Sequence, residues 1–337
     1  MWLQELFSKA NSYLYQDQTM LALGALSVWA GWGIGKKFGW IAGSLFVWAI
    51  WEGIRISWWT VSPQGFDQSR FLVFSLGAVR AQVTVLLLAG LAGGLTGRLR
   101  DDLLGVFAVL GLVSSLSLIV LGQSILVNTS MDAALVACLL PLLFRYRTRV
   151  RYLAVLPVIA VLKTGSSTGV LALALAFAPL VPLRRLPYFL VAASVTVWLA
   201  PLNHALLYSN GRTALWELAW NFYTEHGFTW RGFGLGTFGY HAAYMQHAAS
   251  ENGQWQNWIW MHNDWLQIGF ELGALGLLLS LLMYGAALLN SLTRPWLASA
   301  VMTFGFCMLT QPLIVHMVPA VYAVLLLHMT LRRPHGA

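Results

Sequence analysis

The feature that most constrains this chain is a series of long uncharged apolar runs that recur from one end of the sequence to the other. Charged residues make up only 9% of the 337 residues, whereas 58% are hydrophobic. Soluble domains carry roughly 25% charged residues, so this composition cannot cover a water-facing surface. Because the runs are spread along the whole chain, we predict one integral membrane domain over residues 1–337.

The runs predict an all-α, polytopic transmembrane bundle of about eleven spans. Several runs are shorter than the roughly 20 residues that cross a bilayer unaided. We therefore expect those at 152–162 and 168–183 to be broken or re-entrant helices. The predicted spans are 19–35, 38–59, 71–95, 103–121, 131–144, 152–162, 168–183, 186–203, 266–290, 296–314 and 317–331.

The distribution of basic residues orients the predicted bundle. Thirteen of the 20 Lys and Arg residues fall in every second connection, which assigns those connections to the cytoplasm. The N-terminus is then outside the cytoplasm and the C-terminus inside. The net charge of +8 reflects these short links, so we expect membrane lipids and no nucleic acid as partners. The connections predicted to face out are 60–70, 122–130, 163–167, 204–265 and 315–317.

The extracytoplasmic loop at 204–265 is far longer than the other connections, and long loops inside compact domains are usually functional. Within it, residues 213–227 predict an amphipathic helix lying on the outer leaflet. Arg212 stands at the first turn of this helix, where a cation gains nothing from the helix dipole. We therefore interpret Arg212 as functional. The predicted apolar face consists of Leu215, Trp216, Ala219, Trp220 and Tyr223.

A glycine-rich segment follows, and it includes Gly234 and Gly236. Glycines at this density let backbone amides approach a ligand closely and form an anion-binding nest. A flexible turn between two interfacial helices is the alternative interpretation.

The loop closes with MHNDWLQ, directly before an apolar run. Asp264 and Gln267 have the spacing of a capping box, which would place His262 just outside the N-terminus of a membrane helix. A helix N-terminus attracts anions, and a neutral imidazole there can accept a proton near pH 7. The alternative is an interfacial histidine beside a simple helix cap.

Four charged residues are predicted at membrane depth, where each costs a few kcal/mol unless it meets a partner or a polar cavity. Glu271 would lie two turns inside the helix that follows the long loop. A buried ion pair, for instance of Glu271 with Arg80, is the structural alternative. Arg70 stands near the predicted outer surface, within reach of lipid phosphates. The four residues are Glu52, Arg55, Arg80 and Glu271.

Three segments in order, GRTALWELAW, RGFGLGTFG and HNDWLQIGFELGALGLL, resemble the signature region of the O-antigen ligase and polymerase superfamily. Asn128 with Asp132 to Pro141, and TGSSTG at 164–169, resemble weaker family elements, so that the resemblance covers residues 122–290. It implies a membrane glycosyltransferase that takes a glycan from undecaprenyl diphosphate on the outer face of the cytoplasmic membrane. The family uses no metal, nucleotide sugar or other cofactor.

The resemblance also implies roles for individual residues. The loop arginine and the histidine of the HN motif are the key family residues, which correspond to Arg212 and His262. Where many members have Ser-Arg in the TGSSTG element, this chain has Ser167, and the nearby Lys163 lacks the two-pronged geometry of arginine. The predicted substrate-binding residues are Lys163, Arg231, Arg70, Arg80, Asn263, Asp264, Glu271, Gly234 and Gly236.

The resemblance leaves the acceptor open. Family ligases deliver the glycan to lipid A–core, polymerases deliver it to another lipid-linked unit, and related enzymes deliver it to a protein hydroxyl. A second class of function is a transporter or flippase, in which the intramembrane charges would line a substrate path. Transporters often carry an internal repeat, and the sequence shows none.

Overall fold

The structure is a computed structural model, and every regular element in the residues it describes is a helix. This confirms the all-α prediction for that part of the chain. The predicted spans at 19–35, 38–59, 71–95 and 186–203 lie outside the described residues. The structure describes residues 97–125, 129–146, 149–185, 212–226, 230, 232–233, 238, 261–313 and 317–331.

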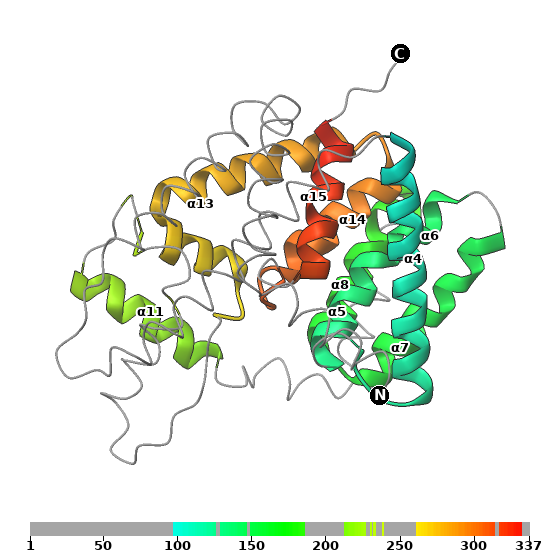
Figure 1. Cartoon of the computed structure of the whole chain (residues 1–337), viewed down its shortest axis with the longest axis horizontal. Coiled ribbons are helices and arrows are strands. Elements are labelled where there is room, and N and C mark those ends of the chain that lie inside the picture. Colours follow the sequence, from blue (N-terminus) through cyan, green and yellow to red (C-terminus); the bar gives the residue numbers. More distant parts are fainter. Residues whose placement is uncertain are drawn as a thin grey trace, which may run out of the picture.

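Each remaining predicted span overlaps a helix (Figure 1). Three short 3-10 helices, at Arg149–Ala154, Ala178–Leu180 and Leu183–Arg185, extend or link them. The α-helices are α4 (Gly97–Val120), α5 (Thr129–Leu139), α6 (Pro141–Arg145), α7 (Val155–Thr164), α8 (Ser167–Phe177), α11 (Arg212–His226), α13 (Asp264–Ser291), α14 (Pro295–Cys307) and α15 (Met317–Leu331).

Two of the described helices are long and apolar enough to cross a membrane, namely α4 over Asp101–Val120 and α13 over Asp264–Ser291. The apolar helix α14 is shorter, because it ends at Cys307 rather than continuing to the predicted end at 314. Thr310 Oγ1 donates to the Cys307 carbonyl, and Pro312 disfavours a helical residue before it. The predicted span at 296–314 is therefore too long.

Helix α5 forms the centre of the bundle and packs against α4, α7, α8 and α14. Its small residues permit this close packing: Ala133, Ala134, Ala137 and Cys138 are all fully buried. A Cβ atom on Gly169 of α8 would lie only 3.1 Å from the Cβ of Ala133. The helices therefore approach each other through alanine and glycine rather than through large side chains.

Hydrogen bonds join several helix starts at one end of the bundle. Gln311 Nε2 donates to Ser130 Oγ at 3.2 Å, and Ser130 Oγ lies 3.3 Å from Ser166 Oγ. The backbone N–H of Leu313 donates to Asp264 Oδ2 at 2.8 Å. The segment after α14 thus connects the starts of α5, α8 and α13, all of which adjoin connections that the charge bias predicts to face out.

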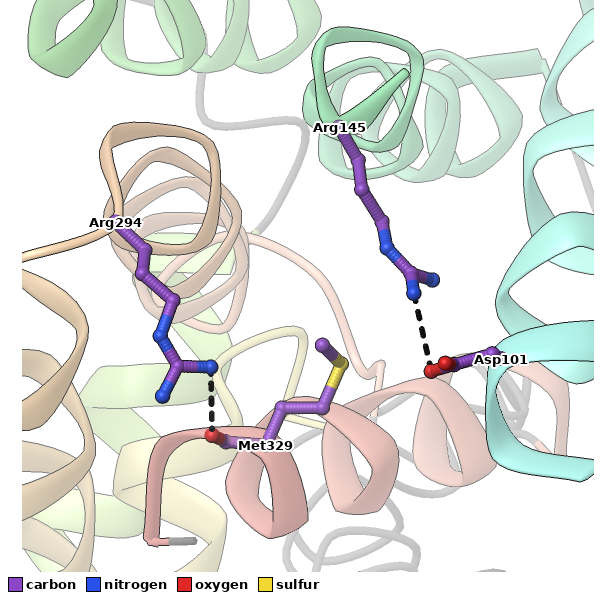
Figure 2. A network of polar contacts seen from close by, with 4 residues as sticks. All are labelled: Asp101, Arg145, Arg294 and Met329. Atoms are coloured by element: carbon purple, nitrogen blue, oxygen red, sulfur yellow. Dashed lines mark hydrogen bonds and ion pairs between the residues drawn. The ribbon is translucent and has the colours of Figure 1, made fainter. Parts of the chain in front are cut away.

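Two arginines lie at the opposite end of the bundle, and Figure 2 shows their polar contacts. Arg145 forms an ion pair with Asp101 at 3.0 Å and lies 5.8 Å from the centre of the Trp296 ring. Arg294 donates to the Met329 carbonyl at 3.4 Å, in the last turn of α15. A cation is favourable there because the C-terminal end of a helix carries partial negative charge.

Helix α13 is broken at Gly273, which has φ 71° and ψ −171° (Figure 1). The two halves meet at a sharp bend and lie close together beside it. A Cβ on Gly276 would overlap the Cβ of Leu272, and one on Gly269 would lie 3.4 Å from Leu277. A continuous apolar helix over 266–290 was the expectation. The glycines in FELGALG instead allow a sharp bend.

Both halves of α13 contact α14 at Gly305. Trp265 in the first half donates its indole N–H to the Gly305 carbonyl at 3.2 Å. Tyr284 in the second half donates to the Val301 carbonyl at 3.3 Å, and its ring occupies the space where a Cβ on Gly305 would lie. The bent helix therefore wraps around α14 at a position that only glycine can fill.

We expect Gly276→Ala to destabilise the protein by about 2 kcal/mol, because the added Cβ overlaps Leu272 and forces the bend to open. Gly285→Ala in the second half is the matched control, since nothing lies within 4 Å of the added Cβ. Alanine favours helix there by about 1 kcal/mol. The thermal unfolding midpoints in detergent measure both effects, and equal midpoints for the two variants would contradict the account of the bend.

Candidate functional site

The break in α13 receives a segment of the predicted long loop. Phe233 N–H donates to the Phe270 carbonyl at 2.8 Å, and Leu275 N–H donates to the Trp230 carbonyl at 3.2 Å. In an unbroken helix, the Phe270 carbonyl and the Leu275 N–H would form hydrogen bonds within α13, and the break at Gly273 prevents this. Gly232, with φ 71°, lies so close that a Cβ would be 2.6 Å from the Glu271 carbonyl oxygen. The loop backbone thus replaces the hydrogen bonds that the helix loses.

An aromatic cluster seals this junction around Phe270, which is fully buried. The ring centres of Phe222 and Tyr223 on α11 lie 5.5 Å from that of Phe270. Phe233 lies at 4.7 Å and Phe238 at 5.5 Å. Because these rings come from separate parts of the long loop, their packing fixes the loop against the first half of α13.

The helix predicted over 213–227 in the loop is confirmed as α11, whereas its predicted place on the outer leaflet stays a prediction. Ala219 and Phe222 are buried and Trp216 and Tyr223 are partly buried, as the packing on α13 requires. Trp220, which was expected on the same face, is 66% exposed. Phe222, which the predicted apolar face did not include, is buried because α11 packs against Phe270 of α13.

Met261 lies at the centre of a set of hydrogen bonds that join α11 to α13. The indole N–H of Trp216 donates to the Met261 carbonyl at 3.0 Å, and the Met261 N–H donates to Gln267 Oε1 at 3.3 Å. Gln267 Nε2 in turn donates to Glu271 Oε1 at 3.0 Å. Met261 is fully buried. The peptide groups on both sides of it are fixed, because its N–H and its carbonyl each form one of these hydrogen bonds.

His262 follows directly and has a left-handed backbone, with φ 52°. Among the described residues it is the one non-glycine residue with positive φ. Its side chain is partly exposed, although its Nδ1 atom is buried. Such a backbone is uncommon outside glycine, costs of the order of 1 kcal/mol, and persists only where the surroundings enforce it. The flanking hydrogen bonds of Met261 and Asn263 supply that enforcement.

Asn263, rather than Asp264, caps α13. Its backbone is extended and its Oδ1 accepts from Leu266 N–H at 3.0 Å. Asp264 becomes the first helical residue, fully buried, with its N–H donating to the Met308 carbonyl at 2.7 Å. The predicted capping box of Asp264 with Gln267 is therefore wrong by one residue. The cap shifts because Asn263 has the extended backbone that a capping residue needs.

Glu271 is buried at 3% exposure, two turns below the start of α13, as predicted. Its carboxylate lies close enough to Tyr223 to influence that phenol. Burial raises the pKa of Tyr223, and the negative charge of Glu271 raises this pKa further. The phenol therefore stays protonated at neutral pH and can only donate or accept hydrogen bonds. The predicted alternative pairing with Arg80 lies outside the described residues.

Lys163 lies in the last turn of α7 and donates to the Ile119 carbonyl near the end of α4. It therefore sits beside the C-terminal ends of two helices, where a cation stabilises both. Gly165 then ends α7 with φ 64°, and Ser166 caps α8 by accepting from Gly169 N–H at 3.2 Å. The TGSSTG segment is thus a helix–turn–helix connection in which Lys163 has a structural contact of its own.

The structure brings His262, Asn263, Asp264 and Glu271 together at one end of α13. Arg212 is the first residue of α11, and its side chain is not among those described. No three His, Cys, Asp or Glu side chains in the described ranges are arranged to hold a metal ion. The predicted site residues outside these ranges are Arg70, Arg80, Arg231, Gly234 and Gly236.

Sequence reasoning missed three contacts at the candidate site. Trp216 was assigned to an apolar face, yet its indole N–H holds Met261. Gln267 was assigned to the helix cap, yet its amide connects Met261 to Glu271. Gly232 belongs to the glycine-rich segment interpreted either as an anion-binding nest or as a flexible turn, and it permits close contact with the break in α13. The glycine spacing in FELGALG was the available signal for that break.

No protein-family model matches this sequence, and no curated protein matches it either.

We expect His262→Gly to be more stable than His262→Ala by about 1 kcal/mol, because alanine retains the steric cost of a left-handed backbone and glycine does not. Thermal unfolding of both variants measures the difference. Glu217, exposed on α11, provides the control, since glycine there should be less stable than alanine by about 1 kcal/mol. The same order of stability at both positions would show that His262 is not strained.

Proposed function

We propose that this protein is a membrane glycosyltransferase that transfers a glycan from undecaprenyl diphosphate to an acceptor hydroxyl on the outer face of the cytoplasmic membrane. The proposal takes the transfer to be inverting and independent of metal. Arg212 and His262 are its catalytic residues. The acceptor is lipid A–core in the ligase form of the proposal, and a second lipid-linked glycan or a protein hydroxyl in its polymerase and protein-modifying forms.

The observation that carries the proposal is the hydrogen bond from Trp216 to the Met261 carbonyl. Arg212 stands four residues before Trp216 on α11, hence one turn away on the same helix face. His262 follows Met261 directly. A single 3.0 Å contact therefore joins the turn that carries the arginine to the turn that carries the histidine, although they are 50 residues apart.

The chemistry assigns one role to each residue. His262 accepts the proton of the acceptor hydroxyl as its oxygen attacks the anomeric carbon, which a general base accelerates typically 10²–10⁴-fold. The bond from this carbon to the diphosphate oxygen breaks, and the diphosphate leaves with the electron pair. Arg212 stabilises the negative charge that develops on the diphosphate. Attack opposite the leaving group inverts the anomeric carbon.

A membrane location with about eleven spans, the N-terminus outside and the C-terminus inside, belongs to the same proposal. Its support is the exposed apolar side of α4, which a soluble protein would cover. The hydroxyl and amide contacts at one end of the bundle and the arginines at the other agree with the orientation. The exposed face consists of Val106, Val109, Val113, Leu116 and Val120.

A transporter is the second candidate, and the break in α13 favours it. Discontinuous membrane helices are typical of transporters, where freed backbone groups bind substrate. Here, however, Phe270 and Leu275 use those groups to bind the loop backbone. This pairing favours a structural role for the break and leaves transferase as the stronger candidate. Solute movement in proteoliposomes without glycan transfer would reverse the ranking.

We expect His262→Ala and Arg212→Ala each to lower the transfer rate at least 100-fold, since each removes one half of the chemistry. The assay contains purified protein in detergent and a glycan linked to undecaprenyl diphosphate. Chromatography of the released undecaprenyl diphosphate measures the transfer rate. His226→Ala, at the other end of α11, is the control and should retain transfer within about twofold. Unimpaired transfer by His262→Ala would refute the assignment of the base.

A further inference from the structure

Gln267 is a buried amide, 3% exposed, whose two ends contact different parts of the site. Its Oε1 accepts from the Met261 N–H at 3.3 Å, and its Nε2 donates to Glu271 Oε1 at 3.0 Å. A carboxylate only accepts hydrogen bonds. Glu271 therefore requires the Nε2 side of the amide to face it, which turns Oε1 toward Met261.

This orientation bears on the residue that follows Met261. The Met261 carbonyl is held by Trp216, so removal of the Gln267 contact would leave Met261 fixed on one side only. The left-handed backbone of His262 costs free energy and needs support from its neighbours. Without the Gln267 contact, His262 gains freedom to relax toward a more favourable backbone conformation.

We propose that Gln267 is a positioning residue for His262, and that Glu271 sets the orientation of its amide. The inference rests on the proposed function for its catalytic consequence, but its structural part concerns only the conformation and exposure of His262. Gln267 acts through Met261 and need not touch the glycan or the diphosphate. A misplacement of about 1 Å can cost roughly 100-fold in rate. Loss of Gln267 should therefore lower kcat roughly 10- to 100-fold with little change in the KM for the donor.

Gln267→Met tests the proposal, because methionine matches the volume of glutamine and lacks its hydrogen bonds. Gln311→Met is the matched control: Gln311 is also buried, at 2% exposure, and bonds Ser130 at the same end of the bundle. The first readout is the rate at which diethyl pyrocarbonate modifies His262, followed by mass spectrometry. We expect this rate to change at least threefold in Gln267→Met and to stay unchanged in Gln311→Met.

A charge-swapped pair separates positioning from a general loss of stability. Gln267→Glu alone places two carboxylates together, and should lower kcat and alter the modification rate of His262. Adding Glu271→Gln returns one amide and one carboxylate to the pair, with an oxygen still facing the Met261 N–H. We expect the double variant to recover the modification rate of His262 to within about threefold of the wild-type value.

The outcomes distinguish the two claims. If the wild type transfers no glycan from any lipid-linked donor, the proposed function fails, while the modification rate of His262 still tests the positioning role. If Gln267→Met leaves both kcat and the modification rate unchanged, the positioning role is refuted. It is also refuted if Gln311→Met changes the His262 modification rate equally, or if the charge-swapped pair fails to recover the rate while unfolding at the wild-type temperature.

Discussion

The break of α13 at Gly273 is the constraint on which the site depends. In a membrane, each backbone N–H and C=O that leaves a helix must find another partner. The Phe270 carbonyl finds its partner in the Phe233 N–H and the Leu275 N–H in the Trp230 carbonyl, both in the long loop, and Gly232 is small enough to let the two backbones meet. The loop is thereby fixed to the first half of α13, whose N-terminus adjoins His262.

Fixing the loop makes a strained histidine possible. The rings around Phe270 hold α11, α11 presents Trp216 to Met261, and Gln267 holds Met261 from the other side. The Asn263 cap defines the backbone on the far side of His262. Free energy from packing and hydrogen bonds thus maintains a left-handed residue that would not form unaided, which is a common property of catalytic positions. In the proposed function, this arrangement presents a base to the acceptor hydroxyl.

The positions of the described helices were predicted well, because they follow from local sequence patterns. The apolar runs predicted α4, α5, α7, α8, α13, α14 and α15 among the described helices, and the periodicity of 213–227 predicted α11. The HND segment gave a helix start within one residue. The rest depends on tertiary contacts: Trp220 is exposed and Phe222 buried because α11 packs on α13, and Gln267 contacts Met261 only because the chain turns at His262. Propensity carries no information about such partners, and the close spacing of Gly269, Gly273 and Gly276 was the sequence sign of the bend.

The central claim is that His262 acts as the base at the proposed site. The most direct measurement is glycan transfer by purified His262→Gly in the presence of added imidazole, which can occupy the space that the side chain leaves. The account predicts that transfer is nearly lost without imidazole, rises with its concentration, and varies with the pKa of substituted imidazoles, as general-base catalysis requires. A folded His262→Gly variant that keeps the wild-type rate, or that stays inactive at saturating imidazole while still binding the lipid-linked donor, would contradict it.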